Sequence, residues 1–480
     1  MNFMVVYRQK NREGYTMKEF LFPKRIIASN NVVNVENLLK KQPLQIGLSE
    51  AFTADFSADG YVILDYGEEI CASLRILTFS SPMTKARFRF GESLTECCAE
   101  LGGEQNATND HALRDFSAEL PSYSDMTFSQ TGFRFVRIDF NGEARIKCAV
   151  AVSEVFKKPI RYRYEGQDGC ISRIFETAKR TVDLCASSGY VWDGVKRDRL
   201  VWIGDMHPEM LALTTLYGRL IEIERSLDFV KEQTPLPGWM NGFPTYSMWW
   251  MIILGDYYER TGAKLYIKRQ LAYLEGLIQQ MDGCVKEDGT LAYPFLFVDW
   301  PTHETPYAEQ GSRAINIMAV KKAIALLKAF DRDTALAEDI LARLLKVEIE
   351  CGDKKQVIGL KYFAVGINEE EKKRLVEGNA KGMSTFMSYY ILKAVASFDK
   401  QKAVEMMKEY YGAMLDKGAT SFFEDFDMDW VENSCRIDEF PKESEKDIHG
   451  DFGKYCYVGF RHSLCHGWSA GVVTFIEEEC

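Results

Sequence analysis

The spacing of apolar residues changes once along this chain, near Pro159, and no other feature constrains the fold as strongly. Before that point, segments such as 86–91 and 133–140 alternate apolar and polar residues with the period of two that half-buried strands show. After it, apolar residues recur three and four positions apart, as in 383–395, where they occupy one face of a helix. The sequence therefore predicts a β-rich part followed by a helical part.

The β-rich part contains short strands at regular spacing, a pattern typical of a β-sandwich. We assign a sandwich of the jelly-roll kind to residues 21–160 and treat 1–20 as a leader that need not be ordered. Further strands are expected at 61–67, 74–79 and 146–155.

The helical part, residues 161–480, contains ten or more helical stretches joined by short links. Such a series suggests an α/α toroid, in which paired helices close a ring. A loop-like stretch at 427–458 interrupts the last pairs, and long loops in compact domains are often functional. Helices are expected at 171–187, 207–233, 245–261, 264–281, 311–330, 333–350, 400–415 and 463–478.

The charge balance limits the partners. The net charge is −11 and the pI is about 5.3, so the chain has no electrostatic attraction to nucleic acid or to anionic membranes. No stretch approaches the roughly 20 consecutive apolar residues that cross a bilayer. A neutral small molecule such as a sugar suits this balance, and we expect a carbohydrate substrate. The oligomeric state stays open, with a homodimer among the options.

The 12 cysteines are scattered without a C-x-x-C pair, which indicates free thiols in a reducing compartment. The N-terminal apolar run, 3–7, is too short for a signal peptide, so we expect a cytoplasmic protein. The nucleotide-binding patterns G-x-G-x-x-G and P-loop are absent.

The densest group of chemically active residues lies at 192–205, in a non-helical link between two helical stretches. Crowded carboxylates raise one another's pKa, and a general acid must hold its proton near neutral pH. The alternative is a structural ion-pair network around the arginines. The group contains Trp192, Asp193, Lys196, Arg197, Asp198, Arg199, Trp202 and Asp205.

A second group lies at 418–426, where Glu424 follows a helix and is surrounded by phenylalanines. A carboxylate buried beside aromatic rings needs partners or has a function. Clusters of this kind are also common at helix starts.

A third group lies at 463–471, where His466 and Trp468 are flanked by small residues that would let them reach a ligand. The alternative is a histidine satisfied within the core. A zinc site is a further alternative, although the spacing fits no common zinc motif. Its ligands would be Cys456, His462, Cys465 and His466.

Asp299 and Trp300 lie in a loop before a helix, with His303 and Glu304 close behind. The pattern fits a turn, or an indole platform beside an acid.

In order and spacing, the three groups resemble the motifs of glycoside hydrolase family 78, the α-L-rhamnosidases. The family pattern D-C-P-x-R-E…(W/Y)-x-x-D corresponds to 193–205, its G-A-T-T-x-W-E to 418–424, and its H-x-W-S to 466–469. Segments 64–67, 89–92 and 133–136 resemble motifs of the family's sandwich, so the resemblance covers about residues 60–475.

The resemblance implies a β-sandwich followed by an (α/α)6 barrel and an inverting hydrolase that needs two carboxylates and neither a metal nor another cofactor. Asp198 falls at the position of the general acid and Glu424 at that of the general base. The remaining positions imply sugar binding by Asp193, Arg197, Trp202, Asp205, Asp299, Trp300, His466 and Trp468.

Three departures from the family pattern concern the substrate more than the fold. Asp198 replaces a glutamate and is one methylene shorter, and Gly194-Val195 replaces Cys-Pro. Family members usually continue into a C-terminal β-sandwich, whereas this sequence stops at Cys480, so we expect a more open pocket. The alternatives are a glycosidase of other sugar specificity, a carbohydrate-binding protein that has lost catalysis, and a zinc enzyme on another toroid.

Overall fold

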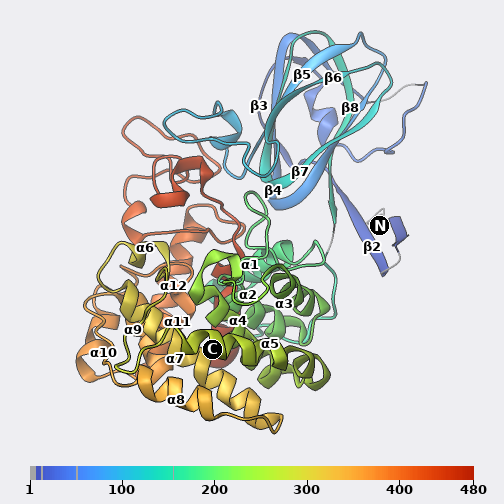
Figure 1. Cartoon of the computed structure of the whole chain (residues 1–480). Coiled ribbons are helices and arrows are strands. Elements are labelled where there is room, and N and C mark those ends of the chain that lie inside the picture. Colours follow the sequence, from blue (N-terminus) through green and yellow to red (C-terminus); the bar gives the residue numbers. More distant parts are fainter. Residues whose placement is uncertain (1–6, 12–13, 50–51, 155) are drawn as a thin grey trace.

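The computed structural model describes residues 7–11, 14–49, 52–154 and 156–480, with side chains from residue 18 onward except that of Cys456. Within these ranges every strand precedes residue 155 and every α-helix follows residue 168 (Figure 1). The change of apolar period near Pro159 thus coincides with the change of secondary structure. No helix in the described ranges is both long enough and apolar enough to cross a membrane.

The described strands form one mixed sheet of eight, in the order β1-β2-β8-β4-β7-β5-β6, with β3 paired to β4. β4 and β8 run parallel, and the other pairs run antiparallel. The strands are β1 (Tyr7–Asn11), β2 (Gly14–Leu21), β3 (Arg25–Val33), β4 (Ala54–Thr78), β5 (Thr84–Gly91), β6 (Asp115–Leu120), β7 (Asp125–Phe140) and β8 (Ala144–Glu154).

The two strands expected at 61–67 and 74–79 are one long strand, β4. Between the two predicted segments the strand is irregular, and its pairing with β7 jumps from Asp65 to Ile70. Gly67 lies inside it at φ +88, a backbone conformation that glycine adopts without steric cost.

Residues 7–21 also differ from the expected leader. β1 and β2 form a hairpin, and β2 continues the sheet by pairing with β8. Phe20 packs against a small apolar cluster of Leu77, Cys148 and Val150. Partial burial of this apolar ring favours the pairing of the segment with the sheet.

The helical part begins with α1 and ends with α13 (Figure 1). Its helices are α1 (Gly169–Cys185), α2 (Met206–Tyr217), α3 (Ile221–Gln233), α4 (Pro244–Thr261), α5 (Lys264–Asp282), α6 (Trp300–His303), α7 (Ala308–Ala329), α8 (Ala335–Leu344), α9 (Lys355–Val365), α10 (Glu369–Val376), α11 (Ser388–Ala396), α12 (Lys400–Asp416) and α13 (Val472–Glu479).

Several helix predictions need correction. The stretch 207–233 is two helices, α2 and α3, because the chain turns at Gly218, whose φ is +75. Of the stretch 463–478 only α13 is α-helical, and a 3-10 turn precedes it. The helix expected over 383–395 begins only at Ser388. No helix was predicted where α9 and α10 lie.

Six helices contact one another in a closed order: α2, α4, α7, α9, α11, α13 and again α2. Of these, α2 and α4 are buried on nearly all sides, which explains their uninterrupted apolar character. Five others pack against this series, with α1 on α2 and α13, α5 on α4 and α7, α8 on α7, α10 on α9 and α11, and α12 on α11. The links between consecutive helices therefore lie together at the ends of these helices.

The sheet is docked on these links by hydrogen bonds between residues hundreds of positions apart. The Phe460 N–H donates to the carbonyl of Gln105 (2.7 Å), and the Glu69 N–H donates to Thr420 Oγ1 (2.8 Å). The β-rich part thus contributes directly to the surroundings of the helix links.

Candidate active site

Three irregular segments, 193–205, 422–426 and 462–468, lie side by side at the ends of helices. Each contains one of the groups singled out in the sequence, and an isolated β-bridge pairs Gly194 with His466. The segments are joined by three backbone hydrogen bonds, from Gly467 N–H to Asp193 O (2.7 Å), from His466 N–H to Phe422 O (3.0 Å) and from Glu424 N–H to Ser463 O (2.9 Å).

Arg197 connects the two proposed catalytic carboxylates. Its Nη1 lies 3.0 Å from Asp198 Oδ1, and its Nη2 lies 2.5 Å from Glu424 Oε1. The planar fork of a guanidinium presents its donors in fixed directions, so it sets the spacing of the two groups that it binds. These two oxygens are at most about 8 Å apart, a limit that admits the separations of both retaining (about 5–5.5 Å) and inverting (about 6.5–9.5 Å) glycosidases.

Glu424 is almost completely buried, at 2% exposure. Its Oε2 accepts the N–H of Ser463 at 2.8 Å, and its backbone carbonyl accepts the indole N–H of Trp468 at 2.9 Å. Burial raises the pKa of Glu424, although the charge of Arg197 and the N–H of Ser463 act in the opposite direction. These contacts hold the Glu424 carboxylate in one orientation.

His466 lies among the carboxyl groups. Its Nε2 is 3.9 Å from Asp193 Oδ2, 3.9 Å from Asp205 Oδ2 and 3.8 Å from Glu424 Oε1. Burial, with a smaller effect of Arg197, holds the pKa of His466 well below its usual range, so its imidazole is neutral. These distances exceed those of hydrogen bonds, so the four side chains face a common point without bonding one another there.

Asp193 and Asp205 are buried carboxyls of a different kind. Burial raises the pKa of each well above its ordinary value, and neighbouring carboxylates reinforce the effect. Asp193 Oδ1 accepts the N–H of Leu200, which closes the loop that bears Arg197. Asp205 Oδ1 accepts the hydroxyl of Tyr246 at 3.2 Å. Protonated carboxyls can donate hydrogen bonds as well as accept them.

Aromatic rings extend from this cluster. Trp468 lies 4.1 Å from His466, centroid to centroid, and stacks on Phe386 at 5.0 Å. Trp202 packs edge-on against Tyr246, the partner of Asp205. Its indole nitrogen is buried and has no hydrogen-bond partner among the described residues.

Asp299 and Trp300 lie further from the cluster. Asp299 caps α6, where its carboxyl accepts the N–H of Thr302 at 3.0 Å and the hydroxyl of Ser384 at 3.2 Å. The Trp300 ring stacks on Tyr455 at 5.9 Å, and Phe297 lies between Trp300 and Tyr246. The structure therefore brings seven predicted residues into one cluster, with Trp202, Asp299 and Trp300 connected to it through other side chains.

Solved structures with this arrangement of chain exist. A rhamnosidase from Klebsiella oxytoca with rhamnose bound matches with a TM-score of 0.72 over 99% of this chain and 96% of that one, at 16% sequence identity. A family 78 rhamnosidase of Bacillus sp. GL1 matches with a TM-score of 0.70 over 92% of this chain and 48% of that one, also at 16% identity. This chain has the fold of the rhamnosidases.

An α-L-rhamnosidase of Streptomyces avermitilis in complex with L-rhamnose matches over 89% of this chain and 44% of that one, with a TM-score of 0.65 and 15% identity. The chain thus spans about half the length of the Bacillus and Streptomyces proteins and nearly all of the Klebsiella protein. No protein-family model matches the sequence, and no curated protein matches it.

The β-rich part supplies residues that the sequence did not reveal. Glu92 is fully buried, and its carboxyl accepts the hydroxyl of Ser463 at 3.0 Å and the N–H of Leu464. Ser463 is therefore fixed on one side by Glu92 and on the other by Glu424. Only the motif-like segment 89–92 hinted at this contact, and it gave no indication of the partner.

A buried ammonium stabilises the same region. Glu92, Glu96 and His449 have atoms close enough to hold a metal ion, and no other such group occurs within the described ranges. The Lys196 Nζ lies among them, at 3.2 Å from Glu92 Oε2, 3.0 Å from Glu96 Oε1 and 3.3 Å from His449 Nε2. A lysine side chain thus supplies the positive charge that these carboxylates require.

The residues of the zinc alternative do not gather at one point. His462 Nε2 accepts the N–H of Asp425 at 2.8 Å, which occupies the lone pair that a metal would need. Cys465 packs with Cys71 and Cys185 in an apolar cluster. The side chain of Cys456 lies outside the described residues.

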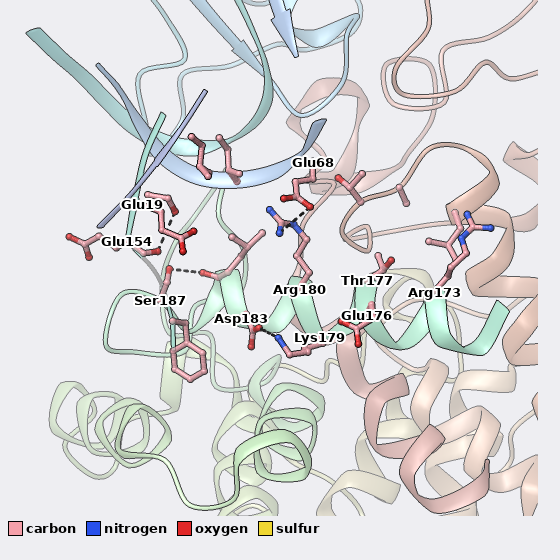
Figure 2. Close-up of a pocket in the computed structure, with 18 residues that line it drawn as sticks. Glu19, Glu68, Glu154, Arg173, Glu176, Thr177, Lys179, Arg180, Asp183 and Ser187 are labelled. Carbon is pink, nitrogen blue, oxygen red and sulfur yellow. Dashed lines mark hydrogen bonds and ion pairs between the residues drawn. The ribbon is translucent and has the colours of Figure 1, made fainter. Parts of the chain in front are cut away.

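A separate cavity of about 530 Å³ lies between α1 and the sheet (Figure 2). Four of its charged side chains form two pairs, Lys179 with Asp183 at 2.6 Å and Arg180 with Glu68 at 3.3 Å. None of the ten predicted site residues lines it. The predicted site residues lie at the helix links and not in this cavity.

Proposed function

We propose that this protein is a glycoside hydrolase that releases terminal α-L-rhamnosyl residues, or a closely related sugar, from glycosides or oligosaccharides. One observation carries the proposal: Arg197 joins Asp198 and Glu424 where three helix links meet. The shared fold supports it, because solved proteins with this fold are rhamnosidases, two of them with rhamnose bound.

We assign the fold to a jelly-roll-like β-sandwich that includes β1 and β2 and extends to residue 160, followed by an (α/α)6 barrel over 161–480. The closed order of six helices, each with a helix packed against it, supports the barrel. The described cysteines are free of disulfides, which supports a cytoplasmic location.

In the proposed mechanism Asp198 protonates the leaving oxygen, while Glu424 removes a proton from a water on the opposite face of the sugar. The water then attacks the anomeric carbon as the glycosidic bond breaks, and the configuration inverts. The backbone N–H of Ser463 and the fork of Arg197 keep the Glu424 carboxylate in position.

The remaining polar groups suit a sugar in the substrate site. Protonated Asp193 and Asp205 and the neutral ring of His466 would bind hydroxyl groups without adding net charge. The indoles of Trp202 and Trp468 would pack on the apolar face of the ring.

A direct test is hydrolysis of a panel of p-nitrophenyl glycosides headed by the α-L-rhamnoside. We expect release from the rhamnoside by the wild type and a loss of about 10²–10⁴ in kcat for Glu424→Gln, the range for removal of a general base. The matched control is Asp425→Asn, because the Asp425 carboxyl accepts the N–H of Phe426 and is not bound to Arg197 in the described contacts.

Three outcomes distinguish the alternatives. A larger loss for Asp425→Asn than for Glu424→Gln would show that the base is misassigned. Release from another glycoside alone would identify a different sugar. Binding of rhamnose without release from any substrate would indicate a carbohydrate-binding protein.

The stereochemistry is tested separately, by proton NMR of the sugar first released in D2O. We expect the anomer opposite to that of the substrate. Initial release of the substrate's own anomer would mean a retaining mechanism with a covalent intermediate.

A further inference from the structure

Asp198 has a second partner, which comes from the β-rich part. His111 Nε2 lies 3.2 Å from Asp198 Oδ1, the same oxygen that Arg197 contacts. The imidazole is 37% exposed and the Asp198 side chain 15% exposed, so the pair lies between the protein and solvent. A histidine from the loop between β5 and β6 therefore reaches the proposed proton donor.

The loop that bears His111 is held firmly in this position. Arg199 donates to the carbonyls of Gln130 (2.7 Å) and His111 (3.4 Å). Arg461 binds Asp110 at 3.1 Å, and Arg114 donates to the carbonyl of Lys196 at 3.0 Å. Contacts from two separate links of the helical part thus fix the histidine beside Asp198.

The backbone on both sides of the contact is unusual. His111, Asp198 and Arg199 have φ values of +65, +55 and +52. Left-handed conformations are uncommon for residues other than glycine, and strained ones concentrate at functional sites. Here they turn the carboxyl and the imidazole toward each other.

A general acid must carry a proton at the pH at which the enzyme works. An aspartic acid in water titrates near pH ~3.9 and a histidine near ~6.5. An imidazole within hydrogen-bond distance of a carboxylate can pass a proton to it, and a free imidazole holds its proton to higher pH than a free carboxylic acid does. The aspartate that replaces the usual glutamate thus has a source of protons at its side.

We propose that His111 is a further residue of the acid half of the site and supplies the proton that Asp198 delivers to the leaving oxygen. The inference rests on the proposed glycosidase function. In each turnover Asp198 gives its proton to the glycosidic oxygen as the C–O bond breaks. The imidazolium of His111 then reprotonates Asp198 and regains a proton from solvent, while the proton from the attacking water leaves through Glu424.

Charged groups surround both Asp198 and His111. Arg197 faces Asp198, and Asp193, Asp205 and Glu424 lie near enough to interact with it electrostatically. Asp110 faces His111 from its own loop and is neutralised by Arg461, while Arg199 approaches the backbone of His111.

The decisive variant is His111→Gln, because its amide places a nitrogen near the position of Nε2 but does not take up a proton. Substrates with good and poor leaving groups, p-nitrophenyl and methyl α-L-rhamnoside, separate acid catalysis from structure. We expect a loss of kcat/KM of less than about tenfold for the aryl substrate and about 10²–10³-fold for the methyl glycoside. The alkaline limb of the pH profile should move toward lower pH, because no imidazole then resupplies the proton.

The matched control is Asp110→Asn, which weakens the docking of the loop and leaves His111 in place. It should retain the leaving-group dependence and the pH profile of the wild type. Equal losses on both substrates for His111→Gln, with an unchanged alkaline limb, would overturn the proposal and leave His111 a structural role.

A readout independent of activity keeps this inference separate from the proposed function. The chain has 6 histidines, so selective ¹⁵N labelling makes the His111 ring observable by NMR in the full-length protein. We expect the Nε2 resonance of His111 to change in Asp198→Asn and not in Asp425→Asn. No change in Asp198→Asn would show that the contact does not exist in solution, even if the protein hydrolyses rhamnosides.

Discussion

Replacing Glu209 by glutamine should make the protein more stable at neutral pH than the wild type. Glu209 lies on α2, beneath the cluster, at 1% exposure, and its Oε1 has no hydrogen-bond partner among the described residues. Burial raises the pKa of Glu209 well above the ordinary 4.5, and the charges of Asp205 and Asp193 add to the effect. The folded protein therefore retains a proton that the unfolded chain has lost.

The sign and the magnitude follow from this difference. A raised pKa in the folded state means that the wild type loses stability as the pH rises above about 4.5, whereas glutamine does not titrate. The gap in free energy of unfolding between variant and wild type should widen by up to about 1.4 kcal/mol per pH unit. Between pH 5 and pH 7 the gap should therefore widen by at most about 2.7 kcal/mol.

Urea unfolding followed by tryptophan fluorescence at pH 5, 6, 7 and 8 measures the gap. Glu232→Gln, which removes a charge from the exposed surface of α3, reports the effect of charge loss alone. If the gap for Glu209→Gln stays constant across this range, Glu209 is not held protonated in the fold, and the argument from its burial is wrong.

Three other substitutions test the site. Arg197→Lys should reduce kcat/KM at least about a hundredfold with an unchanged circular dichroism spectrum, because an ammonium lacks the fork that joins Asp198 to Glu424. Gly467→Ala should lower the free energy of unfolding by about 1–3 kcal/mol in urea denaturation, because the new Cβ would lie 1.7 Å from Glu209 Oε1. Trp468→Phe should cost about 1–3 kcal/mol in the same assay, because it removes the donor to the Glu424 carbonyl.

The order of β-rich and helical parts could be predicted from the sequence because apolar periodicity reflects burial on one face of an element. Helices were missed where the apolar residues do not lie on one face of the helix. α9 is buried along most of its length and shows little amphipathic pattern, while α10 is rich in charge and starts at a capping box on Asn368. The two segments of β4 were separated because Gly67 is as typical of a turn as of an irregular strand.

The clustering of the site was anticipated through the order of three motifs, and the segments that contain Asp193, Glu424 and His466 do meet. Contacts such as that of His111 with Asp198 could not be predicted, because they join residues far apart in sequence through a loop without any motif. Asp299 was ambiguous for another reason. Its carboxyl caps a helix, and sequence alone does not distinguish a capping residue from one that binds substrate.

The docking of the sheet on the helix links has a consequence for folding kinetics. The bond between Glu92 and Leu464 spans 372 residues, and that between Gln105 and Asp451 spans 346. Contacts of such high sequence separation form late, since a long loop must close before they stabilise anything. During refolding, helical circular dichroism should recover before hydrolytic activity, because activity also requires the sheet to dock on the helix links. The interval between the two signals would measure the time that the two halves take to assemble.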